Sequence, residues 1–240
     1  MALLKTIWVF SVLGLTLLFL LPPSVVLLLL YFLRIKKFTG WAVGKIVKYW
    51  ARFLVRLVGC EVTVEGVENI PCTGGVCFVS NHGSIFDIVL LLAYSKRLIG
   101  FIAKKELMLA PFLNIWILLI GGHFIDRKNI RKSVGTINTG IRQIKAGSAM
   151  IIFPEGHRSK GGLLPFHSGS FKLATQAAAP ILPVAITGSH GIFEQYHRVC
   201  TVPVRVVFGK PINTADLLPE ERRQALADRV RGVIAGALNP

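Results

Sequence analysis

The sequence predicts an α/β fold: a sheet with flanking helices, preceded by an N-terminal membrane-embedded helical hairpin and a basic amphipathic helix. Three observations carry this prediction. Residues 7–33 are apolar almost without interruption, and basic side chains recur at spacings of three and four along residues 41–59. From Glu61 onward, short strand-like runs alternate with longer helical ones, which is typical of α/β domains. We therefore predict two regions: membrane-anchoring helices in residues 1–59 and an α/β domain in residues 60–240.

Composition agrees with a membrane segment and points to anionic partners. The chain has 240 residues, of which 52% are hydrophobic, and its mean hydropathy of +0.59 is high for a soluble domain. The net charge of +16 favours nucleic acid, anionic lipid or phosphorylated substrates as binding partners. The cysteines form no C-x-x-C pair and lie near no histidine at zinc spacing, so neither a metal site nor a disulfide framework is expected; they are Cys60, Cys72, Cys77 and Cys200.

The N-terminal apolar run is interrupted once, at Pro22-Pro23. Its length and the lack of an A-x-A site disfavour a cleaved signal peptide. One continuous helix would rise about 40 Å and span a bilayer core, whereas two helices broken at the prolines, about 22 Å and 15 Å long, would not cross. Positive charge on both sides of the run favours the hairpin, with both ends on the cytoplasmic face; these residues are Lys5, Arg34, Lys36 and Lys37.

The following segment predicts a helix with one basic stripe. Aromatic rings that suit a membrane interface accompany the stripe. At about 1 kcal/mol for each basic residue near an anionic surface, the stripe contributes about 4 kcal/mol. The alternative is a core helix with one solvated face, but residues 1–60 contain no Asp or Glu, which favours the interface. The stripe is Lys45, Lys48, Arg52 and Arg56, and the rings are Trp41, Tyr49 and Trp50.

The remainder of the chain predicts alternating elements without an internal repeat or a linker. Strands are expected at 61–66, 74–80, 98–104, 123–126, 149–153, 181–187 and 202–209. Helices are expected at 84–95, 109–120, 129–145, 169–179 and 214–238.

The stretch NHGSIFD, residues 81–87, places a histidine and an aspartate beside a predicted strand end. In a continuous helix, His82 and Asp87 would lie about 140° apart and would not meet. However, Ser84 to Asp87 matches an S-x-x-D capping box, which leaves His82 in a turn before the helix. Asp87 then accepts a bond from one imidazole nitrogen and leaves the other as a base, and the helix N-terminus favours an anion. The alternative is that Asp87 only caps the helix and His82 only packs.

Further charged residues follow other predicted strands, where open α/β sheets commonly place ligand groups. Glu155 and Arg158 follow one strand, Arg127 follows a second, and Lys104 and Lys105 follow a third. Together these basic residues are suited to binding a phosphate, although any one alone is more often a solvated surface charge. The sequence has no phosphate-binding glycine loop, no dinucleotide fingerprint and no G-x-S-x-G motif, which disfavours nucleotide enzymes and serine hydrolases.

Four stretches occur in the order NHGSIFD, GGHFIDR, FPEGHRS and ILPVAITG. In this order they resemble the motifs of the glycerolipid acyltransferase family, in particular its 1-acylglycerol-3-phosphate acyltransferases. The resemblance covers about residues 60–210. The first stretch matches the family's H-x-x-x-x-D motif, and an N-terminal membrane segment agrees with the family.

The resemblance implies a reaction and assigns roles within it. His82 would be the general base on an acceptor hydroxyl, oriented by Asp87, and the hydroxyl would attack an acyl thioester directly. The acceptor would be 1-acylglycerol-3-phosphate, the product phosphatidic acid, and the co-substrate acyl-coenzyme A or acyl carrier protein. No metal or bound cofactor is implied. The positive charge on both sides of the N-terminal run places the active site at the cytoplasmic face of a membrane. The positions that match acceptor-binding residues of the family are Lys104, Lys105, Arg127, Glu155, Gly156 and Arg158, and Pro183 matches the fourth motif.

Two departures from the family pattern bear on the headgroup of the acceptor. His157 stands where the family usually has threonine, and His167 and Ser168 stand where it often has lysines. The same reaction on another lysolipid or on glycerol-3-phosphate therefore stays open. A non-catalytic protein that binds anionic lipid would explain the charge, but it gives no reason for His82 and Asp87. A nucleic-acid binder is disfavoured because no nucleic-acid motif occurs.

Overall fold

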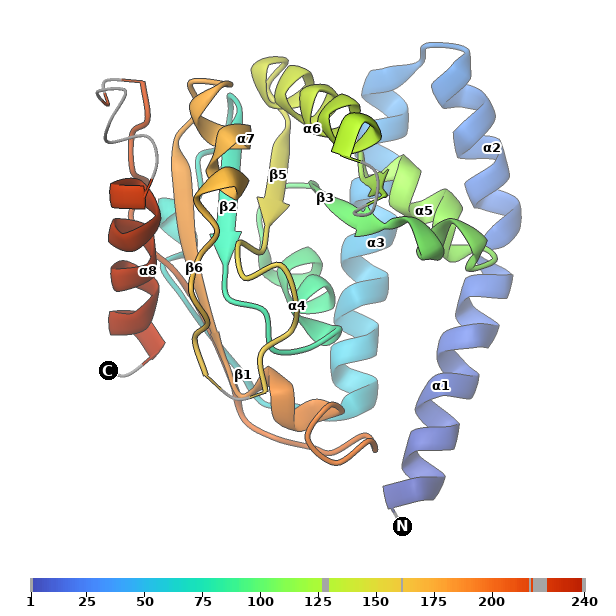
Figure 1. Ribbon diagram of the computed structural model, residues 1–240. Helices are drawn as coiled ribbons and strands as arrows, with labels where there is room; N and C mark the ends of the chain where they lie inside the picture. The colour runs from blue at the N-terminus through green and yellow to red at the C-terminus, as the bar shows by residue number, and fades with distance from the viewer. Residues whose placement is uncertain (1, 127–129, 161, 216, 218–223, 239–240) are drawn as a thin grey trace.

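The computed structural model describes residues 2–126, 130–160, 162–215, 217 and 224–238. Within these residues, seven strands form one sheet in the order β1-β7-β6-β2-β5-β3-β4, with helices on both of its faces (Figure 1). The predicted α/β fold is therefore confirmed. The strands are β1 Val62–Glu65, β2 Val76–Ser80, β3 Ile99–Lys104, β4 His123–Ile125, β5 Ala149–Ile152, β6 Ile181–Thr187 and β7 Val204–Phe208.

The direction of the strands places the candidate residues at one edge of the sheet. β2 is parallel to β5 and β6, β5 is parallel to β3, and β3 is parallel to β4. The carboxyl ends of these strands therefore meet at the same edge, which is where open α/β sheets bind ligands. β7 runs antiparallel to β6 and pairs in parallel with the edge strand β1.

The central strand β2 is buried on both faces, which explains its continuous apolar sequence. Val76 and Phe78 belong to a core cluster with α3 and α4, whereas Cys77 and Val79 belong to a second cluster with α6, α7 and α8 on the other face. This split follows from the two-residue period of a strand. The helices of the domain are α4 Phe86–Tyr94, α5 Leu113–Leu119, α6 Ile130–Lys145, α7 Lys172–Thr175 and α8 Gln224–Leu238.

Two of the expected helices are shorter than the sequence indicates. The region 169–179 forms a 3-10 turn, η3 Ser168–Phe171, and then the single-turn α7, because Ala178 adopts a left-handed conformation with φ of 51°. Of the helix expected from Thr214, the described residues form α8 Gln224–Leu238, and Thr214 itself is not helical. Thr214 is instead buried, with its hydroxyl donating to the Ala179 carbonyl at 2.8 Å, so it contributes to the domain core.

The N-terminal region consists of α1 Ala2–Phe19, α2 Leu21–Phe32 and α3 Lys36–Val58. The chain does not reverse at Pro22-Pro23, because the prolines occupy the first turn of α2, where a missing N–H costs no helical hydrogen bond. Helical bonds run through the junction, from the Ser24 N–H to the Leu20 carbonyl and from the Leu20 N–H to Thr16. A helical hairpin is present, but its turn lies at residues 33–35. Helices α1 and α2 together form the first arm, and α3 forms the second (Figure 1).

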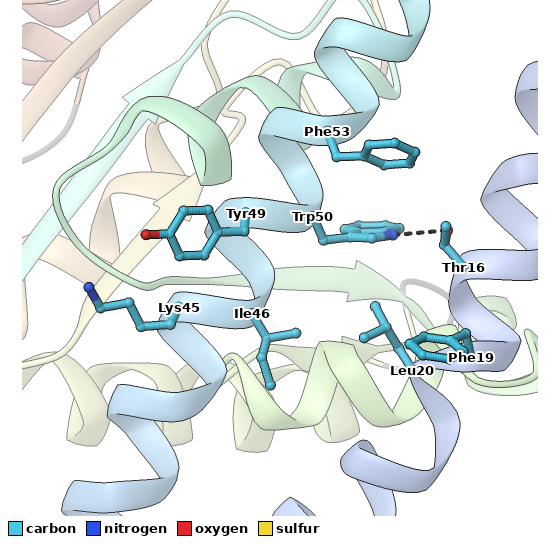
Figure 2. Close-up of a pocket in the computed structure, with 8 residues that line it drawn as sticks. All are labelled: Thr16, Phe19, Leu20, Lys45, Ile46, Tyr49, Trp50 and Phe53. Atoms are coloured by element: carbon cyan, nitrogen blue, oxygen red, sulfur yellow. Dashed lines mark hydrogen bonds between the residues drawn. The ribbon is translucent and has the colours of Figure 1, made fainter.

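Helix α1 is long and apolar enough to cross a membrane, judged by length and composition, and little of it is buried. Helix α3 has two kinds of face. Ala51 and Val55 pack in the core cluster with α4, as the core-helix alternative predicts, whereas Trp41 and Tyr49 are exposed. The Trp50 indole N–H donates to the Thr16 hydroxyl at 3.1 Å and so ties α3 to α1 (Figure 2). An interfacial position for the exposed face of α3 stays a prediction.

Candidate active site

His82 and Asp87 meet through a turn between β2 and α4. The His82 Nδ1 atom lies 2.8 Å from Asp87 Oδ2, and the Asp87 side chain is 0% exposed. The same carboxylate oxygen accepts the backbone N–H groups of Gly83 and Ser84 at 2.8 Å and 2.9 Å. The contact arises because the turn folds back over the first turn of α4. Asp87 accepts the Ser84 N–H as the capping-box pattern predicts, but the helix begins after Ile85 and not directly after Ser84.

This geometry selects one tautomer of His82. A carboxylate can only accept hydrogen bonds, so Nδ1 carries a proton, and in the neutral ring Nε2 then keeps its lone pair. The ring stacks on Phe153 with centroids 4.1 Å apart, and the His82 side chain is 20% exposed. A neutral imidazole held in this way is chemically suited to accept a proton at Nε2.

The N-terminus of α4 does not offer its N–H groups to an external anion, contrary to one expectation from the sequence. Asp87 accepts the Ser84 N–H, and the Ser84 hydroxyl accepts the Phe86 N–H at 3.1 Å. The Ile85 N–H donates to the Glu194 carboxylate at 2.8 Å. The carboxylates of Asp87 and Glu194 therefore occupy the position at the helix N-terminus where an external anion would be stabilised.

The loop after β5 supports the His82 turn from the other side. Glu155 is completely buried and accepts the His82 backbone N–H at 3.2 Å, while the Ser159 N–H donates to the His82 carbonyl at 2.7 Å. Burial raises the pKa of Glu155 to about 7, although the backbone N–H groups of His82 and Leu164 act in the opposite direction. The position of Glu155 fits support of the turn, and its predicted role in acceptor binding stays a prediction.

Gly156 occupies the tight turn of this loop. Its φ is +75°, in the left-handed region, and a Cβ placed there would lie 3.5 Å from the His167 ring. Its N–H donates to the Phe153 carbonyl at 3.1 Å. Glycine therefore lets the loop turn sharply between Phe153 and Arg158. The side chains of His157 and His167 are both exposed.

Arg158 forms an ion pair with Glu194, a residue that the sequence analysis missed. Its Nη1 atom lies 2.8 Å from Glu194 Oε1, and the arginine side chain is 50% exposed. Glu194 follows η4 Ser189–Ile192, more than a hundred positions after His82. No motif in GSHGIFE marks this glutamate, so only the fold reveals it.

The other candidate basic residues lie further along the same sheet edge. Lys104 ends β3 and pairs with Glu106 at 3.4 Å, and both side chains are largely exposed. Lys105 pairs with Asp126, which follows β4, at 2.8 Å. β3 is separated from β2 by β5, so these lysines flank the His82 turn without contacting it. Arg127 lies outside the described residues.

An apolar cavity of about 240 Å³ adjoins the turn. Ile85 and Phe86, which belong to the NHGSIFD stretch, line it together with side chains of α1, α3, α5 and β3. No sequence pattern marks this cavity, because its walls come from segments far apart in the chain. Its lining contains only aliphatic and aromatic residues, a surface suited to a hydrocarbon chain.

A more open groove of about 440 Å³ lies between α1 and α3 (Figure 2). The groove and the cavity share the side chains of Leu20, Ile46 and Trp50. These three side chains therefore form the wall between them, and the hydrogen bond from Trp50 to Thr16 holds that wall in place. Among the described residues, no cluster of His, Cys, Asp and Glu has the composition of a metal site.

Comparison with known proteins places this site in a family. The family model described as Acyltransferase matches residues 61–187. The 1-acyl-sn-glycerol-3-phosphate acyltransferase of Saccharomyces cerevisiae is 32% identical over 190 residues, which cover 76% of this chain and 61% of the relative. The human 1-acyl-sn-glycerol-3-phosphate acyltransferase alpha is also 32% identical, and the match covers 78% of this chain and 67% of the human protein.

A further relative and a solved structure agree with this placement. The chloroplastic 1-acyl-sn-glycerol-3-phosphate acyltransferase BAT2 of Brassica napus is 32% identical, but the chain spans only 54% of its length. The crystal structure of the 1-acyl-sn-glycerophosphate (LPA) acyltransferase PlsC from Thermotoga maritima superimposes with a TM-score of 0.85 at 27% identity. That match covers 99% of this chain and 94% of the crystallised one. With its α/β fold and its H-x-x-x-x-D turn, the chain belongs to the acyltransferase family.

Proposed function

We propose that the protein transfers a fatty acyl group from an acyl thioester to the free hydroxyl of 1-acylglycerol-3-phosphate, which gives phosphatidic acid. The observation that carries the proposal is the His82–Asp87 pair, with Nδ1 bound to a buried carboxylate and Nε2 left as the basic nitrogen. The relatives named for this reaction support the choice of acceptor. The donor is acyl-coenzyme A or acyl carrier protein, and both supply the same thioester.

The proposed reaction needs only this base and its partner. His82 Nε2 removes the proton from the acceptor hydroxyl as its oxygen attacks the thioester carbonyl carbon. The tetrahedral intermediate then expels the thiolate, which takes the proton back from the imidazolium. Asp87 holds the ring and stabilises its transient positive charge, and general-base help of this kind accelerates a reaction roughly 10²–10⁴-fold.

The surroundings of the turn supply binding groups for a phosphorylated lipid. Arg158 is half-exposed beside the turn, and its guanidinium group suits the acceptor phosphate. We assign Arg127, Lys104 and Lys105 to the same phosphate because they follow neighbouring parallel strands. The apolar cavity beside Ile85 would hold an acyl chain, which places its carboxyl end near His82.

The protein would act at the cytoplasmic face of a membrane, bound through α1 and α2. Helix α1 is long and apolar enough to cross a membrane, which supports attachment through this region. The apolar residues of the turn after β3 extend this surface, since Leu109 is 87% exposed and the adjoining α5 packs beside α2. The open groove between α1 and α3 (Figure 2) would then face lipid, and the side chains of Leu20, Ile46 and Trp50 would separate it from the cavity.

An acceptor panel tests the proposal. The purified protein in detergent receives palmitoyl-coenzyme A or palmitoyl-acyl carrier protein with lysophosphatidic acid, lysophosphatidylcholine or glycerol-3-phosphate, and products are identified by mass spectrometry. Phosphatidic acid formed from lysophosphatidic acid in preference to the other products supports the proposal. Faster transfer to lysophosphatidylcholine or glycerol-3-phosphate would show that this acceptor, and not lysophosphatidic acid, is the substrate. Binding to anionic liposomes without any transfer would favour a non-catalytic lipid-binding protein.

A further inference from the structure

Glu194 binds the His82 turn at Ser84 and Ile85, the two residues directly before α4. Its Oε2 accepts the Ser84 hydroxyl at 2.6 Å, and its Oε1 accepts the Ile85 N–H at 2.8 Å. The carboxylate is only 14% exposed, so water competes little for these bonds. In the same segment, the His190 ring contacts the Gly83 carbonyl at 3.2 Å. The segment around η4 therefore also supports the turn.

The same carboxylate engages Arg158. Glu194 Oε1, which holds the Ile85 N–H, also lies 2.8 Å from Arg158 Nη1. A guanidinium group has five N–H donors, so a half-exposed Arg158 keeps donors for a phosphate while it is paired with Glu194. One side chain thus joins the turn that carries the base to the arginine assigned to the acceptor phosphate.

The two contacts depend on different properties of Glu194. The bond from the Ile85 N–H needs an acceptor oxygen, which a glutamine amide also supplies, and the amide NH2 group can donate to the Ser84 oxygen instead of accepting from its hydroxyl. The effect on Arg158 needs the negative charge, because the carboxylate offsets part of the guanidinium charge and repels a phosphate bound to its other donors. Replacing the charge while keeping the shape therefore separates the two effects.

We propose that Glu194 is a positioning and specificity-determining residue: its hydrogen bonds fix the turn that carries His82, and its charge weakens the binding of phosphorylated acceptors at Arg158. The second half rests on the proposed function, because it uses the phosphate as the ligand of Arg158. Weaker binding of the phosphate would favour release of a product that carries the same headgroup.

Equilibrium binding tests the role of the charge. Lysophosphatidic acid in detergent micelles is titrated against the wild type and Glu194→Gln, and binding is followed by the fluorescence of Trp50 and Trp116, which line the cavity. We expect Glu194→Gln to lower the dissociation constant about two- to fivefold, the range expected for a partly exposed ion pair. Glu65→Gln is the matched control, because Glu65 lies on the distant edge strand β1 and its replacement removes one negative charge from an ion pair with Arg205.

Turnover tests the role of the hydrogen bonds. Glu194→Gln is expected to keep kcat within about twofold of the wild type, whereas Glu194→Ala, which leaves Ser84 and Ile85 without their acceptor, is expected to lower kcat at least about tenfold. With 1-acylglycerol, which lacks the phosphate, KM is expected to be the same for the wild type and Glu194→Gln. A purely structural role would not produce this dependence on the acceptor phosphate.

Several results would overturn the inference. A dissociation constant that is unchanged or raised in Glu194→Gln would show that the charge does not weaken phosphate binding. Equal losses of kcat in the glutamine and alanine variants would refute the separation of roles. A wild type that binds lysophosphatidic acid without acylating it would refute the proposed function alone, since the binding ratio still decides the role of Glu194. If neither the wild type nor Glu194→Gln binds lysophosphatidic acid, both the proposed function and the inference about Glu194 are refuted. If Glu194→Ala does not fold, the comparison of Glu194→Gln with Glu65→Gln still decides the role of the charge.

Discussion

Replacing Glu155 with glutamine removes a carboxyl group that folding buries completely behind the His82 turn. In the folded protein, burial raises the pKa of this carboxyl from its ordinary 4.5 to about 7. The unfolded chain releases the proton near the ordinary value, whereas the folded protein keeps it up to about pH 7. The folded state therefore binds more protons within this window, and stability falls as pH rises through it.

The size of this loss follows from the two pKa values. A rise from 4.5 to about 7 corresponds to about 3 kcal/mol, which is present below pH 4.5 and absent above about pH 7. Glu155→Gln keeps an oxygen for the His82 N–H but has no proton to lose. We therefore expect the variant to match the wild type at acidic pH and to be more stable by up to about 3 kcal/mol at alkaline pH.

Urea unfolding in detergent, followed by tryptophan fluorescence at about pH 5 and about pH 8, measures this difference. Glu68→Gln is the control, because it removes an exposed glutamate and should track the wild type at both pH values. A stability difference between Glu155→Gln and the wild type that is equal at the two pH values would refute the reasoning. So would a variant that is less stable than the wild type at alkaline pH only.

The remaining predictions concern the His82 turn and its neighbours. Asp87→Asn should keep the two backbone bonds but lose the charge that stabilises the imidazolium, so kcat should fall about 10²–10⁴-fold with little change in KM, measured by steady-state thiol release. Gly156→Ala forces a left-handed conformation on alanine and should cost about 1–2 kcal/mol, seen as a lower midpoint in urea unfolding. Arg158→Ala should raise KM for lysophosphatidic acid about tenfold or more but leave KM for 1-acylglycerol unchanged; equal KM values for lysophosphatidic acid in variant and wild type would remove Arg158 from the phosphate site.

The parts of the fold that the sequence predicts are those with local causes. The alternation of apolar runs predicts the strands, and the S-x-x-D spacing predicts that His82 and Asp87 meet, because Asp87 binds the turn three to five positions before it. The prediction that the chain reverses at Pro22-Pro23 was wrong for an equally local reason. Proline breaks a helix in its interior but is accommodated in the first turn, and α2 begins just before these prolines.

The parts that escaped prediction depend on contacts between distant segments. Glu194 reaches Ser84 across 110 positions, and nothing near Glu194 in the sequence marks that partner. The apolar cavity likewise combines residues from α1, α3, α4 and α5, each of which looks like an ordinary core residue in its own segment. Sequence patterns report the face of a single element, whereas such sites form only when the elements pack together.

The most direct test of the central claim is thiol release from palmitoyl-coenzyme A by the wild type and His82→Ala, with and without lysophosphatidic acid. Circular dichroism of the variant confirms that it is folded. If His82 is the base that activates the acceptor hydroxyl, release by the wild type depends on the acceptor, and the folded variant loses it by about 10²-fold or more. Undiminished acceptor-dependent release by folded His82→Ala would contradict the account and would leave NHGSIFD as a structural turn.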